Sequence, residues 1–142
     1  HELGNHSMTH PNMSQFGRER LATELQQTEA VFEQVLGEKP VPWFRFPFGA
    51  QNRRVEKLVS ELGYESVYWD IDTLDWKEPS AASMVNKVRQ KLKPGAVILM
   101  HCGSRSGSKA LPRLLDEIIG RGYQPTMLSK VHPSQVSILS RK

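Results

Sequence analysis

Apolar residues recur every three or four positions in four stretches of the chain, and this spacing places them on one face of a helix. We therefore predict helices over residues 14–37, 54–62, 80–92 and 111–119. The predicted inward residues are Leu21, Leu25, Thr28, Phe32 and Val35 in the first helix, Val55, Leu58, Val59 and Leu62 in the second, Val85, Val88 and Leu92 in the third, and Leu111, Leu114, Leu115 and Ile118 in the fourth. Ser80 is suited to cap the third helix.

Short apolar runs between these helices predict strands over residues 42–46, 66–71, 96–100 and 123–128. The third run is apolar throughout, which is typical of a strand buried on both faces of a parallel sheet. Residues 103–108 predict a flexible loop that ends at a helix cap, Ser108.

Helices and strands alternate along the chain, and this order predicts an α/β fold with right-handed βαβ units and a parallel sheet. Four strands and four helices make only part of a closed barrel, and the sequence starts at His1 within what reads as a motif. We therefore expect the first strands to come from an upstream segment of the same protein. Residues 1–128 form the predicted domain, and residues 129–142 form a tail that we predict to be partly disordered.

Composition excludes several classes of protein. The 142 residues suit one domain, and the net charge of +4 comes without a block of Lys or Arg, so no nucleic-acid partner is expected. Cys102 is the only cysteine, which leaves neither a disulfide nor a four-cysteine zinc site. The sequence has no run near the ~20 apolar residues of a membrane span and no signal peptide, so any targeting segment would lie upstream.

Residues able to do chemistry lie at the carboxyl ends of three of the predicted strands. They are residues 45–49, residues 72–76 and His101. In parallel sheets and barrels the working residues lie at the carboxyl ends of strands, so this placement favours a site at that edge. The aromatic residues in these segments are expected in the core by default: Phe46, Phe48 and Trp76.

His6 and His10 stand four residues apart, a spacing that lets two imidazoles reach one metal ion if the segment makes a helical turn. Pro11 disfavours the helical conformation at His10, so such a turn would end there. The alternative is that both histidines are ordinary turn or surface residues.

His101 is a candidate general acid. A carboxylate within reach, Asp72 or Asp75, would hold its imidazole charged and oriented, as that role requires. The alternative is a structural histidine at a strand end, with the two aspartates serving only as loop or helix-entry carboxylates.

Four segments together, in this order, resemble those of the polysaccharide deacetylases with a NodB-homology domain (carbohydrate esterase family 4). The segments are His6-Ser7-Met8-Thr9-His10, Arg45-Phe46-Pro47-Phe48-Gly49, Asp75-Trp76 and Leu99-Met100-His101. The stretch from Trp69 to Lys77 is especially like the peptidoglycan and sporulation-associated members. The resemblance implies a distorted (β/α) barrel, here without its first strands, and removal of acetyl groups from N-acetylglucosamine or N-acetylmuramic acid units of peptidoglycan or a chitin-like polysaccharide.

The resemblance also implies a role for each matching residue. His6 and His10 would hold Zn²⁺, or another divalent metal such as Co²⁺, which would polarise the amide carbonyl and activate water. His101 would protonate the leaving amine with Asp75 orienting it, and Arg45 would hold the carboxylate of the catalytic base. The backbone N–H of Phe48 would help to stabilise the oxyanion, and Trp76 and Leu99 would line the pocket for the acetyl methyl group.

One segment of the family pattern, Thr-Phe-Asp-Asp-Gly, does not occur in the 142 residues. In the family it supplies both the base and the third metal ligand, an Asp, so the resemblance implies that this chain alone binds zinc poorly and does not turn over. Phe48 stands where Tyr is commoner, and because the donor there is a backbone N–H we expect this change to be tolerated.

Two other functions remain open. The first is a non-catalytic, glycan-binding or wall-associated relative that lacks the catalytic Asp pair. The second is a structural α/β domain, for which His6, His10, Asp75 and His101 would be scattered in space. The family acts on extracellular polymers, so the resemblance implies a secreted or membrane-anchored parent at the cell envelope.

Overall fold

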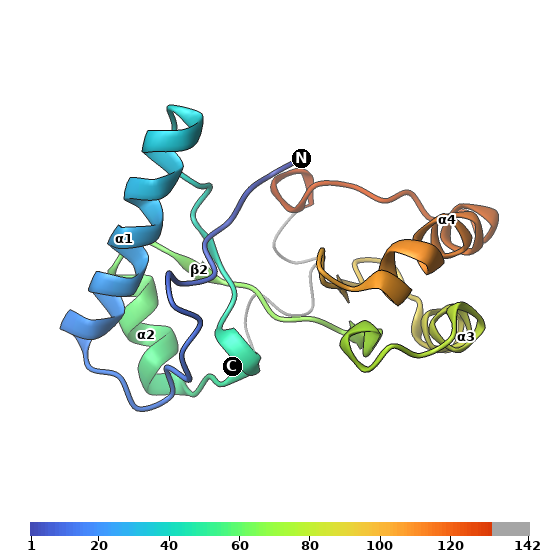
Figure 1. The fold of residues 1–142 in the computed structure, drawn as a ribbon, viewed down its shortest axis with the longest axis horizontal. Coiled ribbons are helices and arrows are strands. Elements are labelled where there is room, and N and C mark those ends of the chain that lie inside the picture. The colour runs from blue at the N-terminus through green and yellow to red at the C-terminus, as the bar shows by residue number, and fades with distance from the viewer. Residues whose placement is uncertain (132–142) are drawn as a thin grey trace. The chain divides into compact units, whose positions relative to one another are not determined.

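The computed structural model describes residues 1–131, and the chain divides into two compact units, His1–Tyr68 and Trp69–Lys142. Each unit has its own cluster of buried side chains and its own pair of parallel strands. Figure 1 shows the first unit from blue to green and the second from green to red. Most of the predicted tail, residues 132–142, lies outside the described residues.

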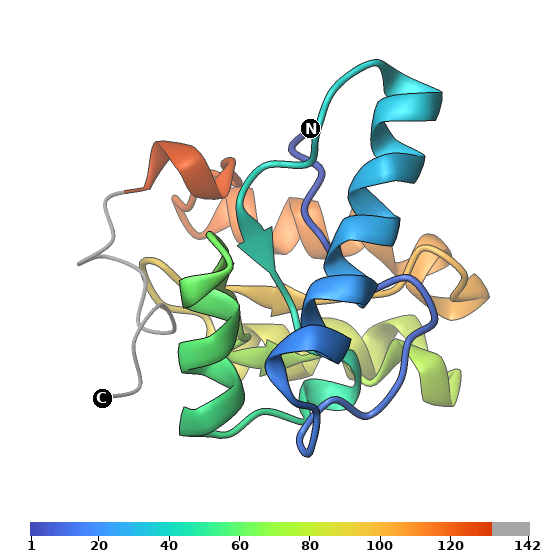
Figure 2. The ribbon, with the colours of Figure 1, turned by 90° about the vertical axis from the view of Figure 1, so that its left-hand side faces the viewer.

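The first unit contains helix α1 (Arg18–Leu36), strand β1 (Trp43–Phe44), helix α2 (Arg53–Glu61) and strand β2 (Glu65–Ser66). β1 and β2 pair in parallel, and Asn5 forms a further parallel bridge with Phe44. The N-terminal segment is therefore a neighbour of β1, and His6 follows that bridge directly. The two helices of this unit lie side by side (Figures 1 and 2).

The apolar spacing correctly predicts both helices of this unit. Leu21, Leu25 and Thr28 are buried on α1, and Gly37 ends the helix in the left-handed conformation, with φ 75°. In α2, Val55 and Val59 are buried. The predicted inward position of Val35 is wrong: its side chain is 71% exposed, because the core of the unit ends before the last turn of α1.

The second unit contains strand β3 (Ile71–Asp72), helix α3 (Ala81–Lys91), strand β4 (Ile98–Leu99) and helix α4 (Arg105–Gly120). β3 and β4 are parallel with Ile71 opposite Ile98, so the residues after both strands emerge at the same edge. α3 and α4 lie side by side and bury Met84, Val88 and Leu114 among their apolar residues (Figure 1). Ser80 caps α3 as predicted, since its hydroxyl accepts from the backbone N–H of Ser83.

Helix α4 corrects two predictions. It begins at Arg105, where Ser104 is the cap, and not after Ser108, so most of the predicted flexible loop is helical. Leu111 and Leu115 are exposed although they share the apolar periodicity with the buried Leu114 and Ile118. Only one stripe of α4 meets the core. The helix has more apolar residues than that stripe has positions, so some of them are exposed.

The strands are shorter than predicted. The run at 66–71 divides between β2 and β3, β4 takes up only two residues of 96–100, and Ile98 is only partly buried. The predicted strand at 123–128 is wrong: within residues 1–131 this stretch has no strand and leads into a 3₁₀ turn, Leu128–Lys130. The mixed α/β class and parallel pairing are confirmed, and the barrel stays a prediction. None of the described helices has the length and apolar character to cross a membrane.

Candidate active site

The predicted site residues form two groups, one in each unit. The first unit brings together His6, His10, Arg45 and Phe48. The second brings together Asp75 and His101, and Leu99 on β4 lies two residues before His101. Within each unit, therefore, the residues are grouped and not scattered as in a structural domain with accidental motifs.

His6 has a defined protonation pattern because of its contacts with Arg45. Its Nδ1 lies 2.6 Å from the carbonyl oxygen of Arg45, and since a carbonyl only accepts, Nδ1 carries the proton. Nε2 is then the basic nitrogen, and Nη2 of Arg45 donates to it at 3.3 Å. A histidine whose Nδ1–H is bonded to a backbone carbonyl is oriented in the way typical of a metal ligand that binds through Nε2.

His10 comes close to His6 without a helical turn. The two ring centroids are 5.0 Å apart and the rings meet edge to face, while His10 also contacts the ring of Phe48 at 4.7 Å. Ser7 and His10 both have positive φ, 68° and 55°. The segment therefore makes no helical turn, and a tight loop brings the two rings together instead, closed by the hydroxyl of Ser7, which accepts from the backbone N–H of His10.

Glu24 of α1 holds the loop between the two histidines and was missed in the sequence. Its carboxylate accepts from the backbone N–H of Met8 and of Thr9, each at 2.9 Å, and from the Thr9 hydroxyl at 2.6 Å. Burial alone raises the pKa of Glu24, but these hydrogen bonds outweigh it and leave the pKa below the ordinary value. The available signal was a carboxylate within the buried stripe between Leu21 and Thr28.

A metal ion would find two ligands here. His6 and His10 are two imidazoles within one loop, whereas a catalytic zinc site has three protein ligands. No group of three or more His, Cys, Asp or Glu side chains suited to a metal occurs among residues 1–131. The described residues thus fit two positions of such a site and do not complete it.

Phe48 presents its backbone in an unusual conformation. It lies in the 3₁₀ turn Pro47–Gly49 with φ 58°, a region that costs a residue with a Cβ on the order of 1 kcal/mol. Its side chain is 71% exposed, so the default expectation of a core aromatic is wrong here, whereas Phe46 is buried as expected. Within residues 1–131, no hydrogen bond is formed by the backbone N–H of Phe48.

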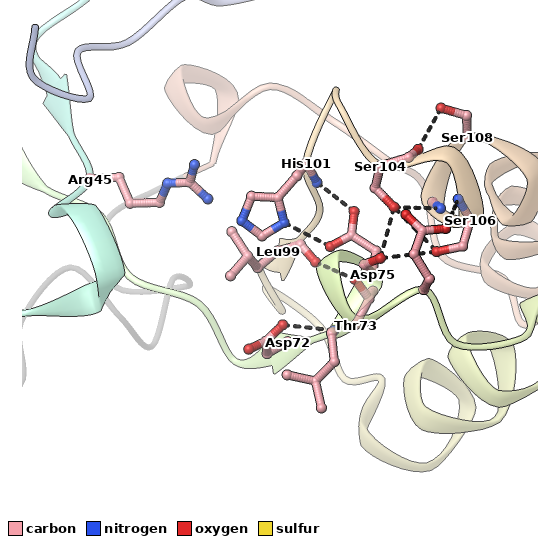
Figure 3. A network of polar contacts seen from close by, with 12 residues as sticks. Arg45, Asp72, Thr73, Asp75, Leu99, His101, Ser104, Ser106 and Ser108 are labelled. Atoms are coloured by element: carbon pink, nitrogen blue, oxygen red, sulfur yellow. Dashed lines mark hydrogen bonds and ion pairs between the residues drawn. The ribbon is translucent and has the colours of Figure 1, made fainter. Parts of the chain in front are cut away.

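Two hydrogen bonds join Asp75 and His101 (Figure 3). Oδ1 of Asp75 lies 2.7 Å from Nδ1 of the imidazole, and Oδ2 accepts from the backbone N–H of His101, also at 2.7 Å. Asp75 is fully buried, while the His101 side chain is 38% exposed. Burial alone raises the pKa of Asp75, but the hydrogen bonds from His101 outweigh it, so the pKa lies below its ordinary value.

The chain on either side of Asp75 sets its position. Leu74 and Glu78 flank the 3₁₀ turn Asp75–Lys77 with left-handed φ values of 55° and 52°. Asp72, the other candidate partner of His101, accepts instead from the backbone N–H of Leu74 at 2.8 Å and so shapes this turn. Trp76 is 58% exposed and contacts Lys77, so it is not a core residue.

Two serines that the sequence analysis did not select also hold Asp75. The hydroxyls of Ser104 and Ser106 donate to the backbone carbonyl of Asp75 at 2.9 and 3.0 Å (Figure 3). The only signal in the sequence was their position just after His101, in a stretch predicted to be a loop.

Comparison with known proteins identifies the family. Residues 1–67 match the sequence profile of the family described as polysaccharide deacetylase. The chain belongs to the polysaccharide deacetylase family. One relative, the peptidoglycan-N-acetylglucosamine deacetylase of Bacillus cereus, is 34% identical over 136 residues, covering 92% of this chain and 63% of the relative.

Two solved structures are similar in fold as well as sequence. A family 4 carbohydrate esterase from Streptomyces lividans, in complex with acetate, has a TM-score of 0.81 at 32% identity over 89% of this chain and 65% of its own. A CE4 family pseudoenzyme from Bacillus anthracis has a TM-score of 0.79 at 34% identity over 85% of this chain and 42% of its own. The chain thus spans less than two thirds of the length of each of these three relatives.

Proposed function

We propose that this chain is part of a hydrolase that removes N-acetyl groups from N-acetylglucosamine or N-acetylmuramic acid units of a cell-wall or chitin-like polysaccharide. The observation that carries the proposal is the Asp75–His101 pair, in which a buried carboxylate holds a partly exposed imidazole by Nδ1. Family membership supplies the reaction class, deacetylation.

His101 is proposed as the general acid. Because Nδ1 is bonded to Asp75, Nε2 is the ring nitrogen that would carry the transferable proton. When the C–N bond of the tetrahedral intermediate breaks, the nitrogen must take up a proton to leave as an amine, and the Nε2–H of the imidazolium would supply it. Asp75 would fix the ring orientation and stabilise the charged form.

The remaining contacts with substrate follow the chemistry of each group. The Phe48 N–H, which has no acceptor among residues 1–131, is a suitable donor to the oxyanion. We propose Arg45 as the residue that holds the carboxylate of the base, and Trp76 and Leu99 as apolar contacts for the acetyl methyl group.

The reaction is proposed to need a divalent metal, Zn²⁺ or Co²⁺, with His6 and His10 as two of its ligands. Such an ion would supply Lewis-acid polarisation of the acetyl carbonyl. The third ligand would come from outside residues 1–131, and the segment that supplies it would also contribute the strands that close the proposed barrel.

The proposed substrates, and the proposed extracellular or cell-envelope location, rest on the relatives. They include enzymes named as chitooligosaccharide deacetylases and as peptidoglycan deacetylases. The experiment is acetate release from N-acetylglucosamine oligomers and from peptidoglycan by the whole protein of which this chain is proposed to be a part, with added Zn²⁺ and after chelation. Metal-dependent release from either polymer supports the proposal, and the preferred polymer identifies the substrate class.

A second function is a non-catalytic, glycan-binding module of the cell envelope. It is favoured by the similarity to the pseudoenzyme, a mutant of which is described as having restored enzymatic activity, and by the two-ligand donor set. This function predicts that the whole protein of which the chain is a part binds N-acetylglucosamine oligomers and releases no acetate from them.

A further inference from the structure

The first turn of α4 lies directly against the carboxylate of Asp75, and the residue at the contact is Gly107. A Cβ added to Gly107 would lie 2.7 Å from Oδ2 of Asp75, and 3.1 and 3.2 Å from Oγ and Cβ of Ser104. These separations are below carbon–oxygen and carbon–carbon contact distances, so any side chain at position 107 requires Asp75 or Ser104 to move.

Neither neighbour is free to move without breaking hydrogen bonds. Oδ2 of Asp75 accepts from the backbone N–H of His101 and Oδ1 is bonded to its imidazole, both at 2.7 Å, and the whole residue is buried. Ser104 is also buried, and its hydroxyl accepts from the backbone N–H of Gly107 while it donates to the carbonyl of Asp75.

Helix propensity does not explain this glycine. Glycine is the least favourable residue other than proline in a helix interior, so Gly107 weakens the first turn of α4. Gly120, at the other end of the same helix, has open space where a Cβ would be. The close approach of α4 to Asp75 is therefore specific to position 107.

We propose that Gly107 is a positioning residue for the Asp75–His101 pair: its missing side chain leaves the space in which Asp75 holds His101. The effect of Gly107 on catalysis rests on the proposed function, but its effect on the Asp75–His101 hydrogen bond does not. Position 107 is thus expected to determine the geometry of the pair through Asp75, the residue that its missing Cβ would meet.

The test compares Gly107→Ala with Gly120→Ala in the full chain. Gly107→Ala is expected to weaken or remove the downfield proton NMR signal of the His101 Nδ1–H and to lower Tm by roughly 5 °C or more, because overpacking outweighs the gain in helix propensity. Gly120→Ala is expected to keep the signal and to raise Tm slightly. An unchanged Nδ1–H signal in Gly107→Ala overturns the proposal.

A double-mutant cycle keeps the test decisive if Gly107→Ala does not fold. In the Asp75→Ala background the carboxylate that meets the new Cβ is gone, so adding Gly107→Ala is expected to leave Tm unchanged or to raise it. If the Tm loss from Gly107→Ala is the same in both backgrounds, Asp75 is not what position 107 accommodates, and the proposal fails.

Activity gives a separate readout. If the whole protein of which this chain is proposed to be a part releases acetate, Gly107→Ala should lower kcat on the order of 10- to 100-fold, because a small misplacement of the acid affects the chemical step, while KM changes little. If the wild-type whole protein releases none, the proposed function fails, but the NMR signal and the double-mutant cycle still decide the role of Gly107.

Discussion

His101 binds Asp75 through both its backbone and its side chain: the amide donates to one carboxylate oxygen and Nδ1 is bonded to the other, each at 2.7 Å. The two residues are 26 positions apart, and the parallel pairing of β3 with β4 brings them together. Two bonds from one residue to one carboxylate fix the direction of the imidazole as well as its distance.

Asp75→Asn is expected to keep the fold and to lower kcat for deacetylation roughly 100-fold or more, since general acid catalysis contributes 10²–10⁴-fold. An amide in place of the carboxylate no longer stabilises the imidazolium or selects the tautomer. Kinetics of acetate release, with circular dichroism as a folding check, measure the effect. The matched control is Asp116→Asn, an exposed position on α4. Equal rates in the two variants would show that Asp75 has no part in the reaction.

Acid should unfold the chain through buried carboxylates. The ordinary pKa values are 3.8 for Asp75 and 4.5 for Glu24, and both pKa values are lowered in the fold. The stability that each carboxylate contributes is therefore fully present above its ordinary pKa and is lost as the pH falls through the lower, folded value. The free energy of unfolding from urea titrations should decline below about pH 4.5, and Glu24→Gln should reduce that decline.

Glu24→Gln and Glu24→Ala should loosen the loop that carries His6 and His10, because the carboxylate accepts three hydrogen bonds from Met8 and Thr9. Hydrogen exchange at the two backbone amides is expected to speed up about tenfold or more, the equivalent of one lost hydrogen bond. The control is Glu19→Gln, an exposed carboxylate in the first turn of α1. Unchanged exchange in Glu24→Ala would mean that other contacts hold the loop.

The histidine loop should bind a divalent metal through both rings. Titration of Zn²⁺ by calorimetry is expected to show weaker binding in His6→Ala and in His10→Ala than in the wild-type chain, because each variant leaves one imidazole. His1→Ala, an exposed histidine near the same end of the chain, serves as the control. Equal affinity in all four proteins would remove the metal from the proposed function.

The cap of α3 gives a prediction about stability alone. Ser80→Ala removes the hydroxyl that accepts from the backbone N–H of Ser83, and such losses cost about 1 kcal/mol. Urea unfolding measures the change, with Ser83→Ala as a matched exposed substitution in the same turn. Identical midpoints for the two variants would show that the cap contributes little.

The sequence predicts well those features that depend on local periodicity. The buried faces of α2 and α3 follow from Val55, Val59 and Val88 at helical spacing, and the cap at Ser80 follows from its residue type. From the residues alone, the pairing of Asp75 with His101 could be anticipated only as a choice between two aspartates, because Asp72 and Asp75 follow the same apolar run. The family resemblance favours Asp75. In the structure Asp72 accepts from the backbone N–H of Leu74, and Asp75 is the aspartate that binds His101.

Features that depend on contacts between distant segments could not be predicted. The position of Glu24 in the buried stripe of α1 is visible in the sequence, but its partners, the loop at Met8 and Thr9, are not. Gly107 reads as part of a flexible loop, since only the packing of α4 on Asp75 shows why a side chain is excluded. The predicted strand lengths were wrong for a similar reason. The length of an apolar run does not determine how many of its residues pair with a neighbouring strand.

The central claim, that His101 is the acid of a deacetylase, is tested most directly by the rate of acetate release from an N-acetylglucosamine oligomer. The whole protein of which this chain is proposed to be a part, as wild type and as His101→Gln, is to be compared with Zn²⁺ present. The account predicts release by the wild-type protein and a loss of roughly 100-fold or more in the variant. Release at the wild-type rate by His101→Gln would contradict the role of His101, and no release by the wild-type protein would favour the glycan-binding function.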